Sequence, residues 1–242
     1  MSIKQTLLDS LKHGLIVSCQ AQPGDPFFGA EYMARMAIAA QMGGAVGIRA
    51  NGPDDISAIK KSVTIPIFGI EKKSYDGFEP YITPTLREVE RVIKAGADII
   101  AIDATERYKP GMYTTEAILT EIRKQYPDIL VMGDVSTIEE GIKAEKIGFD
   151  LIATTLVGYT KATEDQRDHH IDLNFIKRLT DAIQVPVIAE GRIWTPEEAV
   201  QALSLGAFAV VVGTAITRPQ EITRRFTKHI KGYQEVLNVS KK

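Results

Sequence analysis

The stretch GADIIAIDA, residues 96–104, places a glycine after a helical pattern and follows it with a nearly unbroken apolar run. The same construction recurs at GAVGIRA from Gly44, GFDLIATTL from Gly148 and GAFAVVVGT from Gly206, so the four glycines lie 52, 52 and 58 residues apart. Glycine suits the left-handed residue that ends many helices, and a short apolar run suits a strand buried on both faces. The pattern predicts a helix-to-strand unit repeated about every fifty residues.

A second set of apolar runs lies between these. It comprises LIVSC from Leu15, PIFGI from Pro66, ILVMG from Ile129 and PVIAE from Pro186, at spacings of 51, 63 and 57 residues. The two sets interleave into eight strands. Helical patterns fill the gaps, over residues 31–42, 54–62, 86–95, 115–125, 138–147, 173–183, 195–205 and 221 to about 237.

Eight strands alternating with eight helices predict an α/β fold, a single-domain (β/α)8 TIM barrel over residues 1–242. A doubly wound open sheet is the alternative, and the even repeat that closes at eight favours the barrel.

Charge and apolar patterning exclude several classes of function. With 29 basic and 31 acidic residues the net charge is -2, so no nucleic-acid or membrane partner is expected. No apolar run approaches the roughly 20 residues that span a bilayer, and the N-terminal stretch has no signal-peptide core, which predicts a cytoplasmic protein. The only cysteine, Cys19, is expected to pack in the barrel. His169 and His170 are expected at the surface, so no metal is predicted.

In barrels of this kind, chemistry is assembled where strands end. The polar residues and glycines at the eight predicted strand ends include Gln20, Arg49, Glu71, Lys72, Lys73, Asp103, Asp134, Thr155, Tyr159, Glu190, Gly191, Arg192, Gly213, Thr214 and Arg218.

The third strand ends on two adjacent lysines in the stretch IPIFGIEKKSY, residues 65–75. Alternate side chains of a strand face opposite sides, so Lys72 shares a side with Phe68 and Ile70, whereas Glu71 and Lys73 share the other. Only one lysine is therefore expected to point into the site. Because both sides of this strand are apolar, periodicity does not say which, and two solvated lysines are the alternative.

The ends of the seventh and eighth strands indicate an anion site. Glu190 ends an apolar run, where a carboxylate is costly unless it is paired, so it is either a functional group or half of a structural ion pair. Gly191 and Gly213 allow backbone amides to approach an anion, or serve only as turns. Arg192 and Arg218 supply charge for a bound phosphate, which barrels commonly hold at this place.

The motifs LIVSCQ, GIEKKSYD, YITPT, DVSTIEEG, TTLVGYT, VIAEGRIWTPEEA and VVGTAITRPQ follow one another along nearly the whole chain. In these motifs and in their order, the sequence resembles the N-acylmannosamine-6-phosphate 2-epimerase family. The resemblance implies a (β/α)8 barrel that uses no metal or redox cofactor. It also implies the interconversion of two sugar phosphates, N-acetylmannosamine 6-phosphate and N-acetylglucosamine 6-phosphate, in bacterial sialic acid and amino sugar catabolism.

Carried over by motif, the resemblance implies catalytic roles for Lys72 and Glu190. It places Gln20, Arg49 and Asp134 in the sugar pocket and Arg218 on the phosphate. We add Thr155 and Tyr159 as sugar contacts, and Gly191, Arg192, Gly213 and Thr214 as phosphate contacts. The chain departs from the family in two places: Glu71 replaces an apolar residue and Val157 replaces a serine.

The implied chemistry makes a demand on Lys72. The hydrogen on C2 of the sugar becomes acidic once the ring opens and C1 is a carbonyl, and a lysine removes it only when its amine is neutral. The pKa of Lys72 must therefore fall from ~10.4 through burial or nearby cations, with Lys73 and Arg49 as candidates.

Glu190 would assist ring opening, position Lys72 or supply a second proton site, while Arg49 and Asp134 would orient the acylamino and hydroxyl groups. A Schiff-base aldolase and a non-catalytic sugar-phosphate sensor remain as alternatives. A homodimer is expected, since soluble barrels often pair symmetrically.

Overall fold

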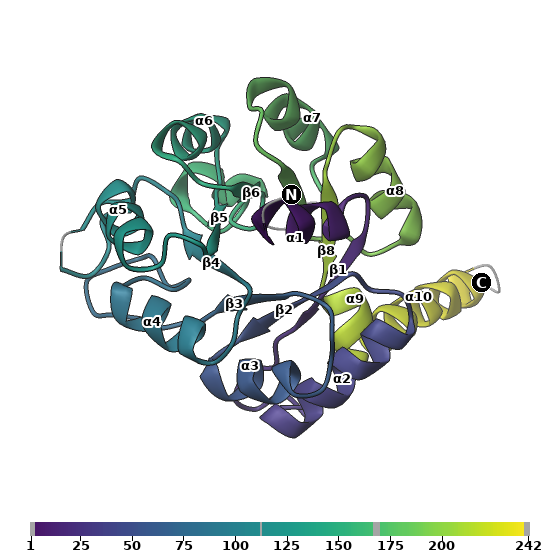
Figure 1. Ribbon diagram of the computed structural model, residues 1–242. Coiled ribbons are helices and arrows are strands. Elements are labelled where there is room, and N and C mark those ends of the chain that lie inside the picture. The colour runs from purple at the N-terminus through teal and green to yellow at the C-terminus, as the bar shows by residue number, and fades with distance from the viewer. Residues whose placement is uncertain (1–2, 112, 167–169, 240–242) are drawn as a thin grey trace.

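The eight predicted apolar runs form eight parallel strands that close into a barrel (Figure 1). The computed structural model describes residues 3–111, 113–166 and 170–239, with residues 234–239 described as backbone only. The strands are β1 (Leu15–Cys19), β2 (Gly47–Asn51), β3 (Ile67–Ile70), β4 (Ile99–Asp103), β5 (Leu130–Asp134), β6 (Leu151–Ala153), β7 (Val187–Glu190) and β8 (Ala209–Val212). They pair in chain order, and β8 returns to β1 with Val210 opposite Leu15. The barrel prediction is confirmed.

The predicted helices also form. They are α2 (Ala30–Met42), α3 (Pro53–Lys60), α4 (Leu86–Lys94), α5 (Thr115–Gln125), α6 (Ile138–Ile147), α7 (Leu173–Ala182), α8 (Pro196–Ser204) and α10 (Pro219–Val239). The four glycines of the repeat, Gly44, Gly96, Gly148 and Gly206, have φ between 93° and 104°. This is the left-handed region that glycine adopts without strain. The repeated glycines therefore end helices in the left-handed conformation, as predicted from the sequence.

Three short elements were not predicted: α1 (Ile3–Leu11), the 3-10 helix η1 (Lys161–Gln166) and α9 (Thr214–Thr217). Helix α9 has only four residues, too few to display a helical period. Helix α1 is stabilised by a tertiary contact, because Leu11 is fully buried in the barrel interior. It lies across the N-terminal end of the barrel and closes it (Figure 1).

The apolar core has two layers. Phe68, Ile70 and Met132 fill the barrel interior. Side chains that reach the C-terminal mouth of the barrel must lie on this same inner side of the strands. A second layer, which includes Cys19, lies between the strands and the helices. Cys19 is fully buried, as expected, and it packs on the side of β1 that faces the helices, because the neighbouring Ser18 takes the inner side. Burial, with a smaller contribution from Asp55, raises the pKa of Cys19 to about 12, so its thiol is unreactive.

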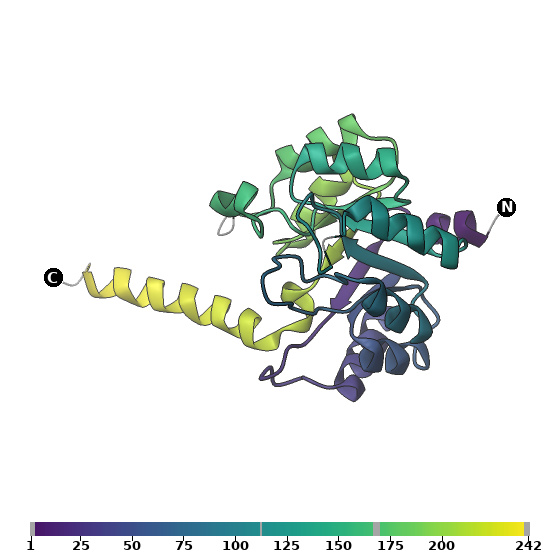
Figure 2. The ribbon, with the colours of Figure 1, turned by 90° about the vertical axis from the view of Figure 1, so that its left-hand side faces the viewer.

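Helix α10 departs from the barrel instead of packing along it. Figure 2 shows it as an arm that extends well beyond the other helices. Phe226, Ile230 and Tyr233 lie on it at helical spacing and are 67%, 55% and 63% exposed. None of the described helices, α10 included, is long and apolar enough to cross a membrane.

Candidate active site

Lys72 is the lysine that enters the barrel. Phe68 and Ile70 belong to the interior cluster, so the alternation of β3 carries Lys72 to the same side. Glu71 faces the helices and forms an ion pair with Arg91 of α4 at 3.0 Å. The family departure at Glu71 therefore adds no charge to the site, while Lys73 is exposed.

The backbone of Lys72 is held by Asn51 of β2 and by the segment after β3, which doubles back. The N–H of Lys72 donates to Oδ1 of Asn51 at 2.8 Å, and Lys72 pairs with Ile82 in an antiparallel bridge. The N–H of Lys73 donates to the carbonyl of Tyr81 at 2.9 Å. These contacts bring Tyr81 and Ile82 beside Lys72, although they lie about ten residues further along the chain.

Arg49 of β2 is the centre of a buried ionic cluster. Only 1% of its side chain is exposed, and it forms ion pairs with Asp134 of β5 and Glu190 of β7. Its Nη1 also donates to Oγ1 of Thr155 at 3.0 Å. Burial disfavours the guanidinium, but the two carboxylates outweigh that cost and raise the pKa of Arg49. Arg49 is therefore a permanent cation at the base of the site.

Asp134 lies beneath the cavity, not on its wall. It is fully buried, and its carboxylate contacts Nη2 of Arg49 at 2.5 Å and Oγ1 of Thr155 at 2.8 Å. Burial raises the pKa of Asp134, and the ion pair with Arg49 limits that rise. The predicted sugar-pocket residue Asp134 is thus placed as a support for Arg49 and Thr155.

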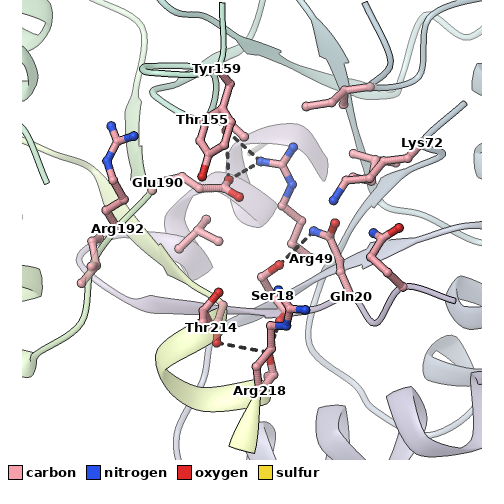
Figure 3. Close-up of a pocket in the computed structure, with 18 of the residues that line it drawn as sticks. Ser18, Gln20, Arg49, Lys72, Thr155, Tyr159, Glu190, Arg192, Thr214 and Arg218 are labelled. Atoms are coloured by element: carbon pink, nitrogen blue, oxygen red, sulfur yellow. Dashed lines mark hydrogen bonds and ion pairs between the residues drawn. The ribbon is translucent and has the colours of Figure 1, made fainter. Parts of the chain in front are cut away.

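The remaining predicted residues line one cavity of about 400 Å³ at the C-terminal end of the barrel. Lys72 points into it from the β3 side and Glu190 from the β7 side (Figure 3). The predicted residues on its wall are Gln20, Arg49, Lys72, Thr155, Tyr159, Glu190, Gly191, Arg192, Gly213, Thr214 and Arg218.

The environment of Lys72 lowers its pKa to about 8. Burial is the largest cause and the positive charge of Arg49 the next, while the carboxylates of Glu190 and Asp134 oppose the shift. An amine with a pKa near 8 has a sizeable neutral fraction at physiological pH, about one-quarter at pH 7.5, and a neutral amine is the condition for a lysine base.

Several polar atoms on the cavity wall are buried without a hydrogen-bond partner among the described residues. They are Oε1 of Gln20, Nε of Arg49, Nε and Nη1 of Arg192, and Nε of Arg218. Buried polar groups in proteins are nearly always hydrogen-bonded. The cavity is therefore suited to a polar ligand with both donors and acceptors.

Only some of the residues predicted to bind phosphate lie close to one another. Thr214 and Arg218 lie close together at α9 (Figure 3), and Gly213 directly precedes that helix where β8 ends. Arg192 has a left-handed φ of 58°, and its guanidinium lies 5.9 Å from the ring centre of Tyr159. Its side chain extends away from Thr214 and Arg218 (Figure 3), so the structure does not join it to the other arginine.

Comparisons with known proteins agree with the resemblance that the sequence motifs indicate. Residues 33–232 match the family described as "NanE: Putative N-acetylmannosamine-6-phosphate epimerase". A protein of Caldanaerobacter subterraneus subsp. tengcongensis, named "Putative N-acetylmannosamine-6-phosphate 2-epimerase", is 60% identical over 229 residues, covering 95% of this chain and 96% of that protein. A Listeria monocytogenes protein of the same name is 47% identical over 230 residues, covering 95% and 97%.

The chain belongs to this epimerase family. The solved structure of the N-acetylmannosamine-6-phosphate 2-epimerase from Clostridium perfringens superimposes with a TM-score of 0.88 at 47% identity, covering 92% of this chain and 95% of that one. A thiamine phosphate pyrophosphorylase from Pyrococcus furiosus, at 18% identity and a TM-score of 0.59, shares the fold alone.

The epimerase site also contains residues that sequence reasoning missed. The wall includes Gln22, Tyr81, Ile82, Trp194 and Thr217, and behind it Asp25 contacts Arg218. Gln22 and Asp25 lie beyond the end of β1 in a loop with no motif, and Tyr81 is reached only because its loop folds back. The available signals were three of the quoted motifs: YITPT begins at Tyr81, VIAEGRIWTPEEA contains Trp194 and VVGTAITRPQ contains Thr217.

The second departure from the family, Val157, is 4% exposed and belongs to the layer between strands and helices. It does not line the cavity, so this departure changes no side chain on the cavity wall. His170 is at the surface, as expected, while His169 lies outside the described residues. In the described part of the chain, no cluster of His, Cys, Asp and Glu is placed to hold a metal ion.

Proposed function

We propose that the protein is an N-acetylmannosamine-6-phosphate 2-epimerase, which interconverts N-acetylmannosamine 6-phosphate and N-acetylglucosamine 6-phosphate in amino sugar catabolism. The observation that carries the proposal is the amine of Lys72, which faces the cavity with a pKa lowered to about 8. Family membership supports the same reaction.

Lys72 removes the C2 proton of the open-chain sugar. An amine with a pKa near 8 is about one-quarter neutral at pH 7.5, whereas an amine at the ordinary lysine value is only about 0.1% neutral. Burial therefore raises the concentration of active base roughly two hundredfold. The resulting carbanion is an enolate, and its oxygen on C1 gains from a fixed positive charge. Arg49, a permanent cation whose Nε has no partner among the described residues, supplies that charge.

Glu190 provides the second proton site: when Lys72 takes the C2 proton, the protonated carboxyl of Glu190 gives one to the opposite face, and exchange with water returns both groups to their starting states. Inversion at C2 requires removal of the proton from one face and its return to the other. Glu190 enters the cavity from the β7 side, opposite the β3 side that carries Lys72 (Figure 3). Its carboxylate is oriented by the ion pair with Arg49 and by Oγ1 of Thr155 at 3.1 Å.

The phosphate is placed at the β8 end of the cavity. Gly213, Thr214 and Arg218 are already together there, and Gly191 has a φ of 115° that leaves its backbone open to an anion. Arg192 joins them by turning its side chain from Tyr159. Gln20, Thr155 and Tyr159 then contact the sugar.

The test is proton NMR of N-acetylmannosamine 6-phosphate with the protein in deuterated water. We expect N-acetylglucosamine 6-phosphate to form and the C2 proton signal to disappear in both sugars. Binding without either change would mean a sugar-phosphate sensor. Borohydride trapping distinguishes the aldolase alternative, because a covalent sugar adduct on Lys72 would require a Schiff base.

We also propose a homodimer that forms through α10. The apolar residues Phe226, Ile230 and Tyr233 make a stripe along an arm that extends away from its own barrel, and the same stripe on a second copy of the chain would cover it. Sedimentation velocity is expected to give a dimer, which F226E/I230E converts to monomer while Thr227→Glu does not. A monomeric wild-type protein would contradict the proposal.

A further inference from the structure

The carboxylate of Asp25 joins the first and the last loops of the barrel mouth. Asp25 lies in the loop between β1 and α2, and its Oδ1 accepts a hydrogen bond from Nη2 of Arg218 at 2.8 Å. Nε2 of Gln220 donates to the same oxygen at 3.1 Å. The contact therefore bridges the seam where β1 meets β8, between residues 193 positions apart.

Asp25 is itself held by its own loop. The N–H of Gln22 donates to Oδ2 of Asp25 at 2.8 Å, and the N–H of Asp25 donates to the carbonyl of Gln22 at 2.9 Å. The N–H of Gln22, and after it Arg218, keeps the pKa of Asp25 below its usual range. Asp25 is thus a carboxylate with a defined direction, and Gln22 lines the same cavity.

Arg218 has few other restraints. Pro219 follows it, and its backbone, with φ -121° and ψ 78°, is non-helical between α9 and α10. Its guanidinium uses Nη2 for Asp25, while Nε is buried beside the cavity with no partner among the described residues. The ion pair therefore directs the guanidinium so that its remaining donors face the β8 end of the cavity.

A carboxylate close to a phosphate site has two opposing effects. Its negative charge repels a bound phosphate, while its hold on the arginine removes the cost of ordering a long, flexible side chain when the phosphate binds. The two effects predict opposite results when the carboxylate is removed, so they can be separated by experiment.

We propose that Asp25 is a positioning residue, whose carboxylate orients Arg218 to bind the phosphate group of the substrate. The inference rests on the proposed function for the identity of the substrate. It concerns binding at the phosphate end and assigns Asp25 no part in the proton transfer at C2.

The experiment compares Asp25→Ala with the wild type and with the matched surface control Asp181→Ala, whose carboxylate is 61% exposed on α7. Asp25→Ala should raise KM for N-acetylmannosamine 6-phosphate about tenfold and change kcat less than about threefold. Asp181→Ala should change neither. The inhibition constant of inorganic phosphate should rise in parallel with KM. An equal loss in kcat, or tighter binding of phosphate, would overturn the proposal.

A double-mutant cycle tests whether Asp25 acts through Arg218. In an Arg218→Ala background, Asp25→Ala should have no further effect on phosphate binding. The same fold-change in both backgrounds would contradict the assignment. If Asp25→Ala does not fold, Asp25→Asn keeps an acceptor for the N–H of Gln22 and should weaken binding in the same direction.

Calorimetric titration with inorganic phosphate reports binding without turnover. A wild-type protein that binds phosphate but does not epimerise the sugar would end the proposed function and leave the role of Asp25 testable. Unchanged phosphate affinity in Asp25→Ala, with normal epimerisation by the wild type, would end only this inference.

Discussion

Arg49 and Glu190 form an ion pair across the mouth of the barrel, although 141 residues separate them in the chain. The same guanidinium pairs with Asp134, so one buried cation compensates two carboxylates. Lys72 lies beside this cluster and is affected by each of its charges, with Arg49 acting in the direction that favours the neutral amine. The cluster therefore connects the stability of the barrel with the basicity of Lys72.

Replacing Arg49 by methionine should destabilise the fold by about 3–5 kcal/mol, because it leaves two buried carboxylates without their cation. Urea unfolding at pH 7 measures the loss. Arg35→Met is the matched control, since Arg35 pairs with Glu31 on the surface of α2 and is 73% exposed. It should cost less than about 1 kcal/mol. Equal losses in the two variants would mean that the buried cluster contributes nothing special.

The activity should depend on pH through Lys72. Because the proton is taken by the neutral amine, kcat/KM should rise from pH 6 and level off above an apparent pKa of about 8. A buffer series with N-acetylmannosamine 6-phosphate checks this limb. Activity that stays constant between pH 6 and 9 would show that no group with the properties of Lys72 limits the reaction.

Lys72→Met should make the protein more stable at pH 7. The pKa of Lys72 is about 8 in the folded protein and near 10.5 when unfolded, so folding penalises the charged amine below pH 8. In the wild type the penalty disappears as the pH rises from 8 to 10.5. The advantage of the variant should reach about 3 kcal/mol below pH 8 and vanish near pH 10.5. An advantage that does not depend on pH would contradict the shift.

Glu190→Gln separates the roles of the carboxylate. If Glu190 is the second proton site, the variant should lose epimerisation more than tenfold while Lys72 still exchanges the C2 proton of one sugar with deuterium. Proton NMR follows both processes in one sample. Loss of exchange and epimerisation to the same extent would instead place Glu190 in ring opening or in the support of Lys72.

The barrel was predictable because helix-ending glycines and doubly buried strands leave local signals that repeat. Which of Lys72 and Lys73 enters the site was not predictable, because both sides of β3 are buried in a parallel barrel and both are therefore apolar in sequence. Phe68 and Gly69 are both buried, Phe68 in the barrel interior and Gly69 against the outer layer. The contact of Glu71 with Arg91 settles the direction, and it depends on a helix twenty residues away.

The sequence predicted which residues lie at the strand ends that form the site, but it did not predict the ion pairs and hydrogen bonds among them. The motif pattern names Asp134, yet its burial beneath Arg49 depends on how long side chains from β2 and β5 meet inside the barrel. Asp25 carried no signal, because the ion pair that gives it meaning joins opposite ends of the chain. The arm formed by α10 reads in sequence as an ordinary amphipathic helix, and its periodicity does not say that the barrel leaves it uncovered.

The most direct test compares Lys72→Ala with Lys73→Ala in deuterated water, following the C2 proton of N-acetylmannosamine 6-phosphate by NMR. The two lysines are adjacent, and only the first faces the cavity. We expect Lys72→Ala to fold normally and to lose C2 exchange by at least a thousandfold, and Lys73→Ala to exchange within about threefold of the wild type. Normal exchange in folded Lys72→Ala would contradict the account.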